Sequence, residues 1–174
     1  MLYNNYCLFG KSGTGKSTLI NQKFISIMPK ENVFAVDFKQ TLNVLPQNRR
    51  ATLDTLLMEA KSRKNSMFIV DDGTGLLRAG NSNIVNDFLF LLNTARHDNN
   101  FYIFVFHGVK FFPEAFTSGI HAFIFLPIDD NQKQVLNKIP IFDSTELKAI
   151  TMKKKPFKYP TFLGGEMAVI YKNK

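Results

Sequence analysis

The sequence predicts a single α/β domain built on a mostly parallel β-sheet. Short apolar runs alternate along the chain with segments whose apolar residues recur at helical spacing, which is typical of strands joined by crossover helices. One run, residues 67–70, is continuously apolar, as expected of a strand that is buried on both faces. At 174 residues the chain is long enough for one domain with a sizeable core.

Five strands and three helices are expected before residue 128. The strands are the apolar runs 3–9, 33–38, 67–70, 101–106 and 122–126. The first helix begins near Lys16, continues through Ile20, Phe24, Ile27 and Met28, and ends at Pro29, because proline cannot continue a helix. Residues 53–60 and 84–96 show the same helical spacing and supply the next two helices. Right-handed crossovers of this kind produce a parallel sheet.

The residues after 127 are expected to form a basic C-terminal extension, about 128–174, of the same domain. Short helices are predicted at 130–138 and 144–151, and a final hairpin of residues 157–163 and 166–171 is predicted to turn at 164–165. From Lys148 onward seven lysines accompany one acid, Glu166, within a chain whose net charge is +8. This composition suits a polyanion such as nucleic acid, and equally suits a solvated surface segment.

Residues 10–18 contain a complete G-x-x-x-x-G-K-[ST] motif directly after the first apolar run. Its glycines allow backbone conformations in which successive N–H groups turn toward an anion. Lys16 adds a positive charge for the β- and γ-phosphates, and the Ser17 hydroxyl suits Mg²⁺. The motif therefore predicts a nucleoside triphosphate site formed by Gly10, Lys11, Ser12, Gly13, Thr14, Gly15, Lys16, Ser17 and Thr18.

Two carboxylates follow the run 67–70, which gives this segment the form of a Walker B strand. Asp71 is expected to hold the magnesium shell, and Asp72 to polarise the attacking water as a general base. Residues 72–75 also satisfy the D-x-x-G pattern of GTP-binding switches, but the chain contains no N-K-x-D motif that would read guanine. ATP and Mg²⁺ are therefore the expected cofactors.

The segment 94–107 resembles the FtsK–HerA superfamily of P-loop ATPases. Within it, the similarity is to the genome-packaging ATPases of poxviruses and of tailless, membrane-containing icosahedral viruses and phages. These proteins carry an Arg-His pair, a few polar residues, an apolar strand and then a polar sensor. Arg96-His97 matches the pair, and His107 stands where the sensor is usually Gln. The resemblance covers about residues 3–127 and implies a P-loop NTPase fold of the RecA/ASCE type, with strand order 5-1-4-3-2.

The resemblance also implies roles and partners. Lys16, Asp72, Arg96 and His107 are the implied catalytic residues, with Arg96 acting as an arginine finger on a neighbouring subunit; a cation favoured by the helix C-terminus is the alternative for Arg96. The implied activity is ATP-driven movement of DNA, expected to be double-stranded, into a preformed capsid. A homo-oligomeric ring would contact capsid or portal-vertex proteins, in the host cytoplasm or at the packaging vertex of the virion. The candidate nucleic-acid contacts are Arg78, Lys110, Phe111, Lys153, Lys154 and Lys155.

Three other functions fit the same motifs. A filamentous-phage-type assembly ATPase shares the loop and the Arg-His segment, but usually carries a transmembrane segment, and no apolar run here is long enough for one. A small-molecule kinase needs an arginine-rich lid, for which Arg49-Arg50 is the one available cluster. A nucleotide switch without catalysis could dispense with Asp72. The single cysteine, Cys7, cannot form an intramolecular disulfide and is expected in the core.

Overall fold

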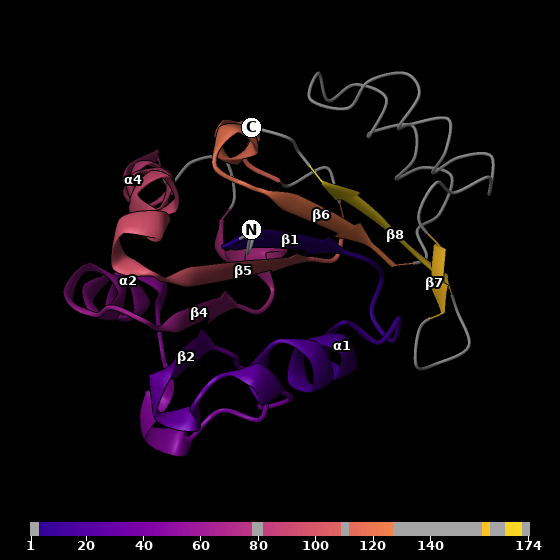
Figure 1. Ribbon diagram of the computed structural model, residues 1–174, viewed down its shortest axis with the longest axis horizontal. Coiled ribbons are helices and arrows are strands. Elements are labelled where there is room, and N and C mark those ends of the chain that lie inside the picture. The colour runs from indigo at the N-terminus through magenta and orange to yellow at the C-terminus, as the bar shows by residue number, and fades with distance from the viewer. Residues whose placement is uncertain (1–3, 78–81, 109–111, 127–157, 161–165, 172–174) are drawn as a thin grey trace.

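The computed structural model describes residues 4–77, 82–108, 112–126, 158–160 and 166–171 (Figure 1). Its strands are β1 (Asn5–Phe9), β2 (Val33–Val36), β3 (Arg49–Arg50), β4 (Met67–Val70), β5 (Phe101–Phe106), β6 (Ala122–Phe125), β7 (Lys158–Pro160) and β8 (Glu166–Tyr171). Its α-helices are α1 (Lys16–Lys23), α2 (Leu53–Ser62), α3 (Gly73–Leu76) and α4 (Ser82–Asp98). Short 3-10 helices cover Ile25–Ile27, Lys30–Asn32, Pro46–Asn48 and Glu114–Ser118.

The strands form one sheet in the order β3-β2-β4-β5-β1-β6-β8-β7. The six strands from β3 to β6 are parallel, whereas β8 runs antiparallel to β6, and β7 antiparallel to β8. The expected order 5-1-4-3-2 is confirmed for the five longer parallel strands, since β6, β1, β5, β4 and β2 follow one another across the sheet. As a result, β5 lies between the strand that leads into the glycine-rich loop and the strand that leads into the two carboxylates.

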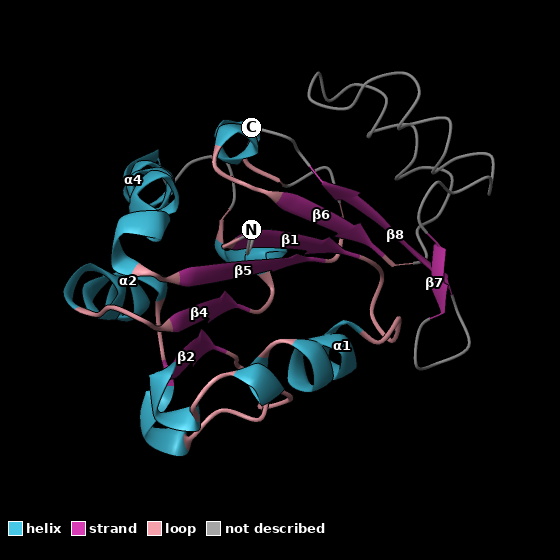
Figure 2. Ribbon diagram, viewed as in Figure 1, coloured by secondary structure: helices cyan, strands magenta, loops and turns pink. Residues whose placement is uncertain are grey.

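Both faces of the sheet are covered, which explains why its strands read as continuous apolar runs. Because successive side chains point to opposite faces, Tyr102, Phe104 and Phe106 of β5 pack with α2 and α4, while Ile103 and Val105 pack with α1. The α2–α4 face is rich in aromatic rings and the α1 face is mostly aliphatic. Figure 2 shows α1 lying apart from α2 and α4.

The first helix and the second strand both end earlier than the sequence predicts. The first helix ends at Lys23 instead of reaching residue 28, and the 3-10 helix that follows has three residues per turn, so that Ile27 is turned outward and is 68% exposed. The second strand ends at Val36 instead of Phe38. It ends there because the Asp37 carboxylate accepts hydrogen bonds from the Thr41 and Leu42 N–H groups and turns the chain away from the sheet.

The C-terminal predictions are only partly within the described residues. The strands β7 and β8 pair as the expected hairpin arms, whereas the predicted turn at 164–165 and the short helices at 130–138 and 144–151 lie outside the described residues. Cys7 is buried in the core, as predicted. Within the described ranges, no helix is both long enough and apolar enough to cross a membrane.

Candidate functional site

The loops that follow β1, β2, β4 and β5 meet at the carboxyl edge of the parallel sheet, where ligands bind in open α/β folds. They enclose a pocket of about 290 Å³. The pocket brings together residues of the expected phosphate loop, the acidic pair and His107, which are far apart in the sequence. Its lining consists of Ser12, Gly13, Gly15, Lys16, Ser17, Thr18, Phe38, Lys39, Thr41, Asp71, Asp72 and His107.

The phosphate loop adopts a conformation that depends on its glycines. Gly13 and Gly15 have φ angles of +80° and +89°, in the left-handed region that other residues rarely adopt. The Gly10 N–H donates a hydrogen bond to the Phe106 carbonyl at 3.1 Å, which ties the start of the loop to the end of β5. Gly15 then caps α1, so that the first helical N–H groups face the pocket and favour an anion there.

Lys16 is buried at the base of the pocket, and its ammonium group has three hydrogen-bond partners. It donates to the carbonyls of Gly10 and Lys11, each at 2.7 Å, and lies 3.3 Å from Nδ1 of His107. Burial lowers the pKa of Lys16 to about 8, although the negative charge of Asp71 opposes this shift. The ammonium group is therefore held in place by these hydrogen bonds, and a bound phosphate would stabilise its positive charge.

His107 follows β5 and lies between Lys16 and Asp72. Because an ammonium group can only donate, Nδ1 of His107 accepts from Lys16, which assigns the proton of the neutral ring to Nε2. Burial, and next the charge of Lys16, lower the pKa of His107, so the ring is neutral at pH 7. Nε2 then directs an N–H toward the region of Asp72, whose Oδ1 is 3.9 Å away.

The two carboxylates leave β4 in different environments. The Asp71 N–H donates to the Val36 carbonyl at 3.0 Å, and burial, followed by the nearby charge of Asp37, raises the pKa of the Asp71 side chain. Asp72 has a φ of +68°, a conformation that aspartate tolerates better than most residues, and its side chain caps α3 by accepting from the Gly75 N–H. Asp72 thus faces the pocket from the start of a short helix.

A fourth loop, residues 37–42, lines the pocket and was not predicted from the sequence. It contributes Phe38, Lys39 and Thr41. The sequence does contain a signal for this loop. Asp37 directly follows an apolar run, just as Asp71 does. The sequence reading extended the strand through Phe38, whose side chain is in fact 60% exposed at the pocket.

Arg96 lies far from this pocket in its own subunit. It is in the last turn of α4, five residues before β5 begins at Phe101, and is exposed. β5 has six residues and ends at the pocket, so about 20 Å of strand separates the two places at roughly 3.3 Å per residue. Within the described part of the chain, its guanidinium takes part in no ion pair.

The structure describes none of the six residues that were predicted to contact nucleic acid. Arg78, Lys110, Phe111, Lys153, Lys154 and Lys155 all lie outside the described residues. Phe112, which follows two of them, is buried against Phe9 and Phe106 in the aromatic half of the core.

Solved structures with a similar fold include two viral packaging enzymes. The genome packaging NTPase from Sulfolobus turreted icosahedral virus 2, in complex with AMPPCP, has a TM-score of 0.65 and 14% identity over 97% of this chain and 92% of that chain. The DNA-packaging ATPase from Sulfolobus turreted icosahedral virus has a TM-score of 0.63 and 14% identity over 98% of both chains. The ATPase domains 2 and 3 of EssC from Geobacillus thermodenitrificans have a TM-score of 0.54 and 12% identity, over 76% of this chain and 34% of that one. The resemblance to packaging ATPases is thereby confirmed at the level of the fold.

The sequence itself carries a family match. Among curated proteins, no sequence matches this chain significantly. The family whose sequence profile does match, over residues 6–124, is described as "ATPase family associated with various cellular activities (AAA)". The matched segment is more than half of the chain and contains the phosphate loop, the acidic pair and His107, which the fold gathers into one pocket. The chain therefore belongs to the AAA family of P-loop ATPases.

Proposed function

We propose that this protein is an ATP-hydrolysing nucleic-acid translocase, a viral DNA-packaging ATPase that drives a genome into a preformed capsid. The main support is the similarity of the fold along nearly the whole length of two packaging enzymes, in a chain whose phosphate loop, acidic pair and His107 line one pocket. Movement of DNA is a proposal that goes beyond the ATPase fold itself.

The pocket residues fit a magnesium–ATP complex. The loop N–H groups and the buried charge of Lys16 suit the phosphates, and the oxygen atoms of Ser17 and Asp71 are of the kind that Mg²⁺ prefers. When bound, Mg²⁺ would neutralise phosphate charge as it develops during hydrolysis. Asp72, which lines the same pocket from the start of α3, would accept the proton of the attacking water.

His107 would serve as the sensor that detects the γ-phosphate. The usual Gln offers an amide N–H to a phosphate or to the attacking water, and the Nε2–H of His107 is a donor of the same kind on the pocket side. Its backbone N–H donates to the Thr74 hydroxyl at 2.8 Å, which links the end of β5 to the turn that carries Asp72. A shift of His107 on contact with the phosphate would therefore be passed through this hydrogen bond to the turn that carries Asp72.

Arg96 would act on the nucleotide of a neighbouring subunit. An exposed arginine at the opposite edge of the sheet cannot reach its own pocket, but it can reach across an interface in a ring whose subunits are packed head to tail. A guanidinium at the γ-phosphate offsets the charge of the transition state. This geometry supports a homo-oligomer in which each site is completed by the next copy.

The partners and location follow from the same proposal. DNA, expected to be double-stranded, would pass through the ring, with contacts from the predicted basic and aromatic residues at 78, 110–111 and 153–155. Capsid or portal-vertex proteins would dock the ring, in the host cytoplasm or at the packaging vertex.

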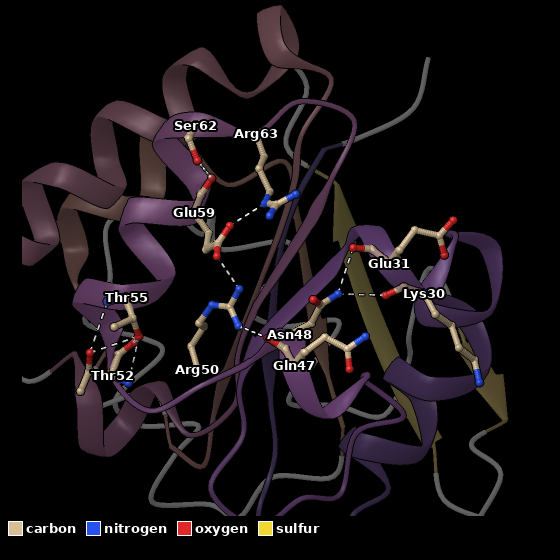
Figure 3. Close-up of polar contacts among 10 residues, drawn as sticks. All are labelled: Lys30, Glu31, Gln47, Asn48, Arg50, Thr52, Thr55, Glu59, Ser62 and Arg63. Atoms are coloured by element: carbon tan, nitrogen blue, oxygen red, sulfur yellow. Dashed lines mark hydrogen bonds and ion pairs between the residues drawn. The ribbon is translucent and has the colours of Figure 1, made fainter.

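A small-molecule kinase is disfavoured by the positions of its candidate lid residues. Arg49 pairs with the buried Asp37. Figure 3 shows Arg50 paired with Glu59 on α2, which also binds Arg63. Both arginines thus hold the β3 edge of the sheet together. Neither is available to close over an acceptor.

The experiment is ATP turnover by the full chain with and without double-stranded DNA, with Lys16→Ala as the control for contaminating activity. Stimulation by DNA that is absent from Lys16→Ala would support the translocase. Turnover that is indifferent to DNA but needs a small phosphate acceptor would support a kinase instead. Normal ATP binding and turnover in Lys16→Ala would remove the phosphate loop from the proposed site altogether.

A further inference from the structure

The Thr41 hydroxyl occupies a position between the two side chains expected to hold magnesium. Its Oγ1 lies 3.2 Å from the Ser17 hydroxyl and 3.5 Å from Oδ2 of Asp71. Ser17 comes from the phosphate loop, Asp71 from β4 and Thr41 from the loop after β2, so three separate segments present oxygen atoms to one point. No sequence motif singles out Thr41.

The loop that carries Thr41 is anchored on two sides. Asp37 is 2% exposed and accepts from the Thr41 N–H at 3.2 Å and the Leu42 N–H at 2.8 Å, while Arg49 pairs with the same carboxylate. From the other side, the Asn21 amide on α1 donates to the Thr41 carbonyl at 3.0 Å. Thr41 is therefore fixed relative both to the sheet and to the helix that begins beside Ser17.

The charges at this point favour a cation. Asp71 is half-buried close to Asp37, and within the described residues it forms no ion pair of its own. Arg49 pairs with Asp37, whereas Asp71 has no arginine partner of this kind and lies beside two hydroxyl groups, with the charges of Lys16 and Lys39 near enough to act on it. One carboxylate flanked by neutral oxygen donors is a set that suits Mg²⁺, which is bound by few protein oxygens together with water and substrate phosphates.

We propose that Thr41 is a third protein group in the magnesium site, alongside Ser17 and Asp71, and that it positions the metal ion of the bound nucleotide. This inference rests on the proposed ATPase function. If Thr41 binds the metal ion, the 37–42 loop connects the nucleotide site to β2 and β3. The connection runs from Thr41 to Asp37 by a hydrogen bond and from Asp37 to Arg49 of β3 by an ion pair.

The test measures metal binding, not turnover. Mn²⁺ is titrated into the complex of the full chain with ATPγS, and free Mn²⁺ is followed by electron paramagnetic resonance. Thr41→Val, which keeps the shape but removes the hydroxyl, is expected to weaken Mn²⁺ binding by about 10–100-fold, the range for losing a group that supports a metal site. Thr41→Ser restores the hydroxyl and is expected to bind Mn²⁺ like the natural chain.

Thr94→Val is the matched control, because its hydroxyl bonds to the Phe90 carbonyl on α4 and lies outside the pocket. ATPγS affinity in EDTA is expected to be equal in all these variants, since Thr41 acts through the metal. Thr41 is exposed, so both Thr41→Val and Thr41→Ala are expected to fold, and both must show the loss.

Two negative outcomes are distinguishable. Mn²⁺ affinity that is unchanged in Thr41→Val and Thr41→Ala, or an equal loss in Thr41→Ser, would overturn the role of Thr41 while leaving the ATPase proposal intact. Failure of the natural chain to bind ATPγS, or equal binding by Lys16→Ala, would overturn the proposed function and this inference with it.

Discussion

ATP binding is expected to weaken as the pH rises above 8, because of the lowered pKa of Lys16. Burial sets this pKa at about 8 in the free protein, and a bound triphosphate would raise it by favouring the charged ammonium. Binding then takes up a proton above pH 8, so affinity is fully present well below the free pKa and falls progressively as the pH rises from there toward the raised pKa of the bound state. Between pH 7 and pH 9 the charged fraction of Lys16 in the free protein falls from about 0.9 to about 0.1, which corresponds to about a tenfold loss of affinity.

The assay is equilibrium binding of a fluorescent ATP analogue at constant ionic strength over this pH range, with circular dichroism at each pH to establish that the fold is intact. Lys16→Ala supplies the control, since it should bind more weakly but with little dependence on pH between 7 and 9. A flat profile for the natural chain would refute the reasoning. A tenfold loss that persists in Lys16→Ala would show that another group takes up the proton.

Three further predictions concern catalysis, assembly and the catalytic turn. Asp72→Asn should keep the fold and ATP binding but reduce hydrolysis by roughly 10²–10⁴, as for loss of a general base; normal hydrolysis would remove Asp72 from the chemistry. Arg96→Ala should bind ATP yet be nearly inactive, and mixing it with Lys16→Ala subunits should restore some turnover; no recovery in the mixture would leave Arg96 as a helix-end cation. Gly73→Ala puts a methyl group 2.9 Å from an aromatic ring of β5 and should lower the free energy of unfolding in urea by about 1–3 kcal/mol. Gly75→Ala, whose added carbon meets nothing closer than 3.6 Å, should be tolerated, and equal losses for both would contradict this packing argument.

The parts of the site that local motifs encode were predictable from the sequence. The loop from Gly10 to Thr18 and the acids Asp71 and Asp72 are recognisable because phosphate and metal chemistry demand those residue types at that spacing. The continuous apolar run 67–70 likewise predicted a central buried strand, and β4 has those bounds. By contrast, the loop 37–42 carries no motif, and its place in the pocket follows only from the strand order.

The predicted end of the first helix was wrong for a related reason. Ile27 and Met28 continue the helical spacing of Ile20 and Phe24, so periodicity alone extends the helix to Pro29. The chain instead tightens after Lys23, and Ile27 is exposed. Spacing reports which residues could share a face, but tertiary packing decides where the backbone leaves that face.

By itself, the sequence determined the fold class, the phosphate-binding loop and the acidic pair, because each depends on residues that are neighbours along the chain. The strand order that brings His107 beside Lys16 was implied by the resemblance, but the tertiary structure alone decided that Thr41 lies between Ser17 and Asp71, and that Arg96 is at the opposite edge from its own pocket. These relations depend on β5 lying between β1 and β4, and on β2 lying next to β4. Strand order is a property of the packed sheet, since many pairings satisfy the same local pattern and only burial of both faces selects among them.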